Sequence, residues 1–222
     1  MKKYIVLSVI ILFFINSVQA EGLTTFKNYS FKNLFNKSSV TEQNTEANPE
    51  ENDNLSADAM ILYNSNDIDG ALKILEEIPE DKRTALDLLL MGNIYQDKKD
   101  TDKAASYYQK SILKDSRFYR GYYNLANLYI ENDNIHEAIR LYKLAIRNKS
   151  DFGYAHYNLG CAYVKIGDLS KAKSSFLRAA EYKKEFPDTY YNLAFVYKKL
   201  NNNKKAEDYL KIYNELIARK LW

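Results

Sequence analysis

The sequence predicts an all-α fold built from a series of stacked helix hairpins. Segments of similar sequence recur every 34 residues, with no insertion between them. Within each segment the apolar residues are spaced as on one face of a helix. Gly and Pro are scarce, at 7 and 3 of 222 residues, which disfavours a turn-rich β protein. The recurring segments are LLLMGNIYQDKKD (88–100), YYNLANLYIENDN (122–134), HYNLGCAYVKIGD (156–168) and YYNLAFVYKKLNN (190–202).

Each unit of 34 residues, counted from residues 85, 119, 153 and 187, contains two predicted helices. Positions 4, 7, 8 and 11 lie on one face of the first helix, and positions 20, 24 and 27 on one face of the second. Small residues at positions 8 and 20 allow the helices to approach closely, and large residues at position 24 fill the space beside them. Position 8 holds Gly92, Ala126, Gly160 and Ala194; position 20 holds Ala104, Ala138, Ala172 and Ala206; position 24 holds Tyr108, Tyr142, Phe176 and Leu210.

The two predicted helices of each unit are separated by a pair of turn residues. Gly and Asn tolerate the left-handed conformation that ends a helix, and Asp or Asn next to it can cap the following helix. In one unit Asn134 and Glu137 have the spacing of a capping box. The pairs are Lys99-Asp100, Asp133-Asn134, Gly167-Asp168 and Asn201-Asn202.

This pattern resembles the tetratricopeptide repeat over residues 85–220. The resemblance implies a right-handed superhelical solenoid of about five helix-turn-helix repeats, which is a fold for binding other proteins. A weaker unit precedes it, with Ala59 and Ala71 at the small positions and Pro79 shortening its second helix. We therefore expect a degenerate N-terminal repeat at 52–84, repeats at 85–118, 119–152 and 153–186, and a repeat with an extended C-terminal helix at 187–222.

Residues 1–20 have the pattern of a secretory signal peptide. Lys2 and Lys3 precede an apolar run from Tyr4 to Ile15, and Val18-Gln19-Ala20 offers small residues for cleavage. The run is shorter than the ~20 residues of a membrane span. We therefore expect an exported, periplasmic or secreted protein of the bacterial cell envelope, with an uncleaved N-terminal anchor as the alternative.

Residues 21–51 are predicted to be a disordered linker, because their later part is polar and acidic. Within it, residues 26–35 are either a mobile leader or a short element that docks on a partner or on a membrane surface.

The sequence offers little for catalysis. His136 and His156 lie in different repeats without the spacing of a metal pair, and His156 occupies a packing position. Cys161 is the single cysteine and has no obvious His or Asp partner. Glycines are too dispersed for a phosphate-binding loop. We expect no enzymatic activity, cofactor, metal or small-molecule substrate.

The family resemblance places a concave groove on the first helix of each repeat. Its central residues alternate between Tyr and Asn, which suits an extended or apolar peptide segment of a protein partner. Alternatively, the Asn residues are simply the consensus of the family. The groove has no Lys or Arg at the positions where the carboxylate-clamp members need cations. Its predicted residues are Leu89, Asn93, Tyr123, Asn124, Asn127, Tyr157, Asn158, Cys161, Tyr191, Asn192 and Phe195.

Charge is unevenly distributed along the chain. Residues 41–81 contain 12 acidic and 1 basic residue, whereas residues 165–220 contain 13 basic and 7 acidic residues. This polarity either steers association with a protein, a second copy or an anionic membrane, or is ordinary solvated charge. The formal charge of +3 is too small to indicate nucleic-acid binding.

Two functions follow from the sequence. The first is a non-catalytic interaction scaffold or adaptor of the envelope. The alternative is a self-associating structural protein. The apolar residues of the C-terminal helix either fold back on the last hairpin or form a partner or dimer surface; these are Ile212, Leu216, Leu221 and Trp222.

Overall fold

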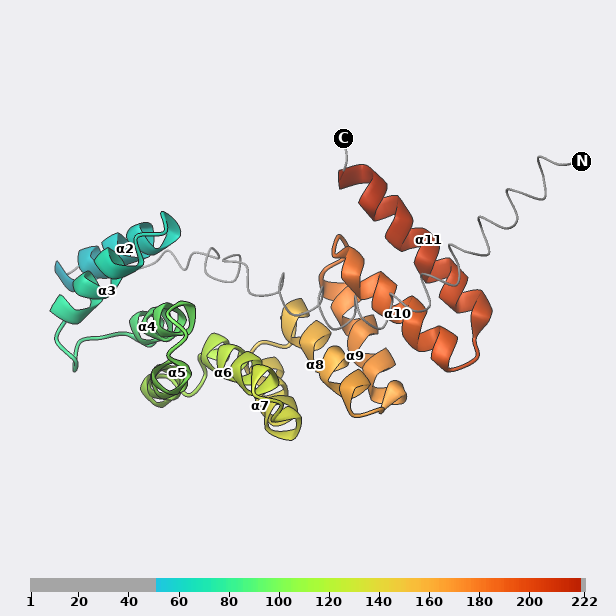
Figure 1. Cartoon of the computed structure of the whole chain (residues 1–222), viewed down its shortest axis with the longest axis horizontal. Helices are drawn as coiled ribbons and strands as arrows, with labels where there is room; N and C mark the ends of the chain where they lie inside the picture. Colours follow the sequence, from blue (N-terminus) through green and yellow to red (C-terminus); the bar gives the residue numbers. More distant parts are fainter. Residues whose placement is uncertain (1–50, 221–222) are drawn as a thin grey trace, which may run out of the picture. The chain divides into compact units, whose positions relative to one another are not determined.

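The computed structural model describes residues 51–220, and every regular element in this range is an α-helix. The predicted signal peptide and linker, and Leu221 and Trp222, lie outside the described residues apart from Glu51 at the start of α2. The helices follow one another as five hairpins, from α2–α3 to α10–α11 (Figure 1). Their bounds are α2 Glu51–Asn64, α3 Ile68–Glu77, α4 Ala85–Asp97, α5 Thr101–Lys114, α6 Tyr119–Glu131, α7 Ile135–Asn148, α8 Gly153–Lys165, α9 Leu169–Tyr182, α10 Pro187–Lys199 and α11 Asn203–Lys220.

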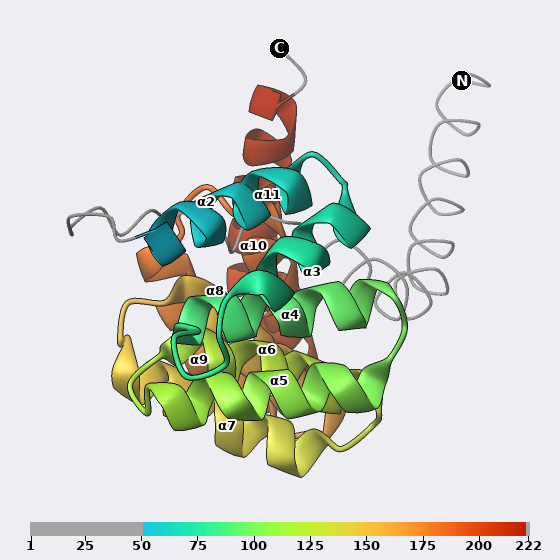
Figure 2. The same cartoon turned by 90° about the vertical axis from the view of Figure 1, so that its left-hand side faces the viewer.

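Consecutive hairpins pack on one another in chain order. The second helix of each hairpin contacts the first helix of the next, as α5 does with α6, and the first helices α2, α4 and α6 also touch in sequence. In Figure 2 the α4–α5 hairpin lies beside the α2–α3 hairpin on one side and α6 on the other. The predicted all-α solenoid of helix hairpins is confirmed.

Close packing within a hairpin depends on the small residue at position 8. A Cβ atom on Gly92 would lie 2.4 Å from Cε1 of Tyr108, and one on Gly160 would lie 2.6 Å from Cε1 of Phe176. Both rings are fully buried. The aromatic ring at position 24 therefore lies directly against the backbone of the first helix, as the spacing predicts.

The turn within each hairpin has the predicted left-handed residue. The φ angles are 70° at Asn66, 66° at Lys99, 60° at Asp133, 79° at Gly167 and 60° at Asn201. This conformation ends the first helix and lets the next residue donate its N–H back to it, as Asp168 does to the carbonyl of Tyr163 at 2.9 Å.

The helix caps agree with the prediction in most hairpins and not in one. The side chains of Asp67, Asp100 and Asp168 accept hydrogen bonds from the third residue of the following helix. The expected capping box at Asn134 and Glu137 is wrong, because the Asn134 side chain makes no cap and Glu137 instead pairs with Arg140, one turn along.

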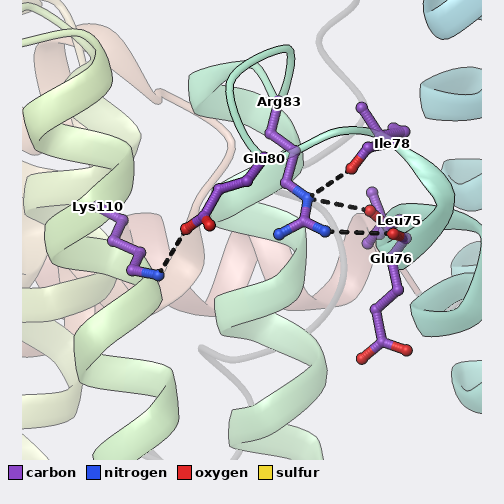
Figure 3. A network of polar contacts seen from close by, with 6 residues as sticks. All are labelled: Leu75, Glu76, Ile78, Glu80, Arg83 and Lys110. Atoms are coloured by element: carbon purple, nitrogen blue, oxygen red, sulfur yellow. Dashed lines mark hydrogen bonds and ion pairs between the residues drawn. The ribbon is translucent and has the colours of Figure 1, made fainter.

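The first hairpin joins the rest through a short polar connection. α3 is the shortest helix of the described chain, and it ends at Glu77, two residues before Pro79. Arg83 caps this end: its Nε donates to the carbonyl oxygens of Leu75 and Ile78 at 3.2 and 3.1 Å, and a terminal nitrogen donates to that of Glu76 at 3.3 Å (Figure 3). The side chain thus satisfies carbonyl groups that a helix end leaves without partners.

Two lysines of α5 hold the same connection. Lys110 pairs with Glu80 at 3.2 Å, as Figure 3 shows, and Lys114 donates to the carbonyl oxygen of Asp81 at 2.9 Å. The connection between the first two hairpins is therefore fixed by polar contacts, while the direct interface between α3 and α4 is small.

We predict that Arg83→Ala loosens the first hairpin without affecting the others. It removes the charged donor of three hydrogen bonds, two of which share the single N–H of Nε, a loss of about 1.5 kcal/mol in all. Because the repeats contact only their neighbours, amide exchange in α2 and α3 should quicken by roughly tenfold while α8–α11 stay unchanged. Hydrogen exchange read by mass spectrometry measures this, with the exposed neighbour Lys82→Ala as the control. A uniform loss of protection in all hairpins would contradict the local role.

Candidate protein-binding face

The predicted groove residues lie on α4, α6, α8 and α10, the first helices of four consecutive hairpins. Most of them are less accessible than a ligand-presenting role requires. Asn93, Tyr191 and Phe195 are half-buried. The remaining eight are at most 9% exposed: Leu89, Tyr123, Asn124, Asn127, Tyr157, Asn158, Cys161 and Asn192.

The buried asparagines link successive first helices. Nδ2 of Asn124 donates to Oδ1 of Asn93 at 2.8 Å, and Nδ2 of Asn158 donates to Oδ1 of Asn127 at 2.9 Å. In both pairs, position 6 of one repeat reaches position 9 of the repeat before it. The next pair follows the same rule with a weaker acceptor, since Nδ2 of Asn192 lies 3.8 Å from Sγ of Cys161. We call these three contacts the asparagine ladder.

Tyrosine hydroxyls complete the ladder. The hydroxyl of Tyr108 donates a hydrogen bond to Oδ1 of Asn93 at 2.9 Å, and the hydroxyl of Tyr142 donates one to Oδ1 of Asn127 at 2.6 Å. Burial raises the pKa of both hydroxyls well above the usual value, so they stay protonated and remain donors. The helix hairpin and its neighbour are thus joined through one shared amide oxygen.

A signal for this arrangement is present in the sequence. Where position 24 carries a tyrosine hydroxyl, position 9 carries an Asn that accepts it, as in the pair Tyr108 and Asn93. Where position 24 is Phe176, without a hydroxyl, position 9 is Cys161. Positions 9 and 24 therefore change together from one repeat to the next, as expected of residues in contact.

Beside the ladder lies a row of exposed charged residues at position 13, which shares a helix face with positions 6 and 9. We call it the charged row; it consists of Asp97, Glu131, Lys165 and Lys199. The row is acidic on α4 and α6 and basic on α8 and α10. Asp97 accepts a hydrogen bond from the hydroxyl of Tyr63 at 2.8 Å, and Lys199 lies over the ring of Phe195 at 5.7 Å. The face thus changes sign along its length.

At the other end of the first helices, aromatic rings cross from one repeat to the next. Tyr119 packs edge-on against Phe152 at 4.8 Å between centroids, and Tyr154 packs on Phe186 at 5.8 Å. The ammonium group of Lys183 lies 3.6 Å from the centroid of Tyr154. Phe118, Phe152 and Phe186 recur at position 34, a signal that the groove prediction did not use. These rings lie at the start of α6, α8 and α10.

The reactive side chains lie at packing positions or on the surface. His156 is buried, its Nε2 lies 2.8 Å from the carbonyl oxygen of Ser150, and burial lowers its pKa. Cys161 is buried, and His136 is exposed. Within residues 51–220, no cluster of three His, Cys, Asp or Glu side chains has the arrangement of a metal site. No helix in this same range is long and apolar enough to cross a membrane.

We predict that Asn158→Ala destabilises the fold, because the change removes two buried hydrogen bonds, to Oδ1 of Asn127 and to the hydroxyl of Tyr123. Each such bond contributes about 0.5–1.5 kcal/mol. Urea unfolding followed by circular dichroism measures the loss. Asn132→Ala, at the exposed residue that follows α6, is the matched control and should have little effect. Equal stability of the two variants would rule out a structural role for the ladder.

Comparison with known proteins agrees with the fold. Models of the tetratricopeptide repeat match residues 88–113, 107–140, 153–186 and 187–211, together about half of the chain. No curated protein sequence matches significantly.

Solved structures of MamA have a similar fold. One crystal structure of MamA is 22% identical, with a TM-score of 0.66 over 79% of this chain and 99% of that one. The ArsTM double mutant of MamA RS-1 is 16% identical, with a TM-score of 0.67 over 78% and 98%. MamA from residue 41 onward of Desulfovibrio magneticus RS-1 is 17% identical, with a TM-score of 0.65 over 78% and 98%. At such identities the likeness concerns the fold alone, whereas the repeat models match the sequence itself. The chain belongs to the tetratricopeptide repeat family, whose stacked hairpins form surfaces for binding proteins.

Proposed function

We propose that the protein is a non-catalytic interaction scaffold of the bacterial cell envelope. In this proposal it binds an extended or apolar segment of another protein on the face lined by α4, α6, α8 and α10. The observation that carries the proposal is the asparagine ladder beside a charged row that changes sign. The location in the envelope rests on the signal-peptide pattern of residues 1–20 alone.

The ladder supports the proposal through preorganisation. Its amides are engaged inside the protein, so their role is to hold successive first helices at a fixed spacing. A face that is already ordered loses less conformational entropy when a ligand binds. The predicted groove thus contributes to binding in two ways: the buried asparagines and tyrosines shape the face, and the half-buried residues touch the ligand.

The half-buried residues give the face its chemistry. Tyr191 and Phe195 offer apolar surface on α10, and Asn93 offers an amide on α4. Aromatic side chains of this kind often carry much of the energy of an interface. The charged row would orient the ligand, with a basic part of the segment near Asp97 and an acidic part near Lys199.

A self-associating structural protein is the second candidate. It is favoured by apolar side chains on α11 that are exposed to solvent, among them Leu210 at 42% and Ile217 at 37%. The place of these residues in the repeat pattern is developed below.

The scaffold proposal predicts contact through α10. A photo-reactive phenylalanine analogue replacing Phe195, expressed in the native cell, should crosslink to a defined protein partner. The same analogue replacing Leu113, which is 83% exposed on α5, is the matched control and should not crosslink to it. Identical crosslinks from both positions would sink the binding-face proposal.

Affinity provides the second half of this test. With the captured partner purified, Tyr191→Ala combined with Phe195→Ala should weaken binding by about tenfold or more, the loss of one or two interface hot spots. Because Asn124, Asn158 and Asn192 are structural, their substitution would confuse lost binding with lost stability. Unfolding curves that match those of the unsubstituted protein serve as the folding control.

A further inference from the structure

The face of α11 that points away from α10 lacks the cover that earlier second helices have. Leu210 at position 24 is 42% exposed, whereas its counterparts Tyr108, Tyr142 and Phe176 are 0%, 1% and 0% exposed. In those hairpins the first helix of the following hairpin packs on the second helix, as α6 does on α5. Within residues 51–220, no helix follows α11.

This uncovered face forms a shallow open groove of about 520 Å³. Its lining combines apolar side chains with an amide and charged groups, and it occupies the side of α11 on which a following first helix would pack. The lining residues are Glu207, Leu210, Lys211, Asn214, Glu215 and Ala218.

At the opposite end of the stack, α2 also has an apolar residue that is exposed where its counterparts are buried. Ile61 of α2 is 64% exposed, whereas the residues at the same position in the later first helices are buried. That position faces the preceding hairpin, because a Cβ on Gly121, seven residues before Leu128 on the same helix face, would lie 2.9 Å from Cγ1 of Ile112 in α5. The buried counterparts are Ile94, Leu128, Ala162 and Val196, at 0%, 3%, 1% and 0%.

We propose that the two ends bind each other in different copies of the chain, with the α2–α3 hairpin of one copy packed on α11 of the next. In this contact α2 serves as the missing first helix and Ile61 enters the groove beside Leu210. The interface repeats a packing that the chain already uses between α5 and α6, α7 and α8, and α9 and α10.

Charge favours this pairing over others. Residues 54–81 carry seven acidic residues and one basic residue, and residues 187–220 carry seven basic and four acidic residues. Unlike ends therefore attract and like ends repel, which disfavours a symmetric dimer through α11. The attraction comes from basic residues around the groove, because the lining itself combines Glu207 and Glu215 with the single cation Lys211. A head-to-tail contact between different surfaces does not close after two copies, so association should grow with concentration.

Complementation between two blocked variants tests the proposal. Ile61→Asp blocks the α2 end and leaves α11 intact, and Leu210→Asp does the reverse. Each variant of the full chain alone should stay monomeric in sedimentation velocity, while an equimolar mixture should give a species of twice the 25.9 kDa chain mass. The unsubstituted chain should form larger species as its concentration rises, and added salt should weaken them. Leu113→Asp, at an exposed position near neither end, should behave like the unsubstituted chain.

Three outcomes would overturn the proposal. A chain that is monomeric at every concentration would mean that the ends are covered from within, for example by residues 1–50. A dimer that survives Ile61→Asp would indicate a symmetric contact through α11. An equimolar mixture of the two variants that stays monomeric would show that the α2 end and the α11 end do not bind each other. Leu210→Asp places a charge at a half-covered position and can impair folding. In that case Ala218→Glu, which changes an exposed residue of the same groove, should block the α11 end in its place.

This contact is independent of the proposed binding face. Ile61→Asp should leave crosslinking from position 195 unchanged, so failure of the end-to-end contact and failure of the scaffold function can be told apart.

Discussion

The close approach of the two helices in each hairpin is the constraint on which the rest of the structure depends. Because position 8 is Gly or Ala, the ring at position 24 lies directly against the first helix. There the hydroxyl of Tyr108 donates a hydrogen bond to Asn93, which in turn holds the next repeat. Packing inside one hairpin thus determines the polar contacts between hairpins, and these set the spacing of the face on which we place the ligand.

Much of this fold could be predicted from the sequence because hydrophobic period, small residues and turn residues all indicate the same hairpin. The structural role of the asparagines at position 6 could not be predicted from the sequence. An Asn at this position can either line a groove or form a contact between repeats. Which of these holds depends on where the neighbouring repeat lies, and helical spacing within one repeat does not specify that. The capping box at Asn134 failed for a similar reason, because Glu137 had a competing partner in Arg140.

The ends of the stack show the same limit of local patterns. Ile61 and Ile94 occupy one position of the repeat and have similar sequence surroundings, yet one is exposed and the other buried. Among the described residues, α3 packs against the helix of Ile94, whereas no second helix precedes that of Ile61. In a repeat fold the same interface recurs between all neighbouring hairpins, so the two ends of the stack have complementary surfaces. The opposite net charges of the two ends then favour contact between unlike ends.

The ladder is not uniform, and this has a consequence for how far its sequence can vary. Between α8 and α10 the amide of Asn192 meets a sulfur atom at 3.8 Å, where the earlier contacts have an amide oxygen within 3 Å. Sulfur is a poor acceptor, but the same amide also donates to the hydroxyl of Tyr157, at position 5 of the preceding repeat, at 3.0 Å. Asn124 has no tyrosine at the matching position, which is Leu89, and it depends on the amide oxygen at position 9. Position 9 can therefore change where position 5 is a tyrosine, because the second acceptor keeps the buried amide satisfied.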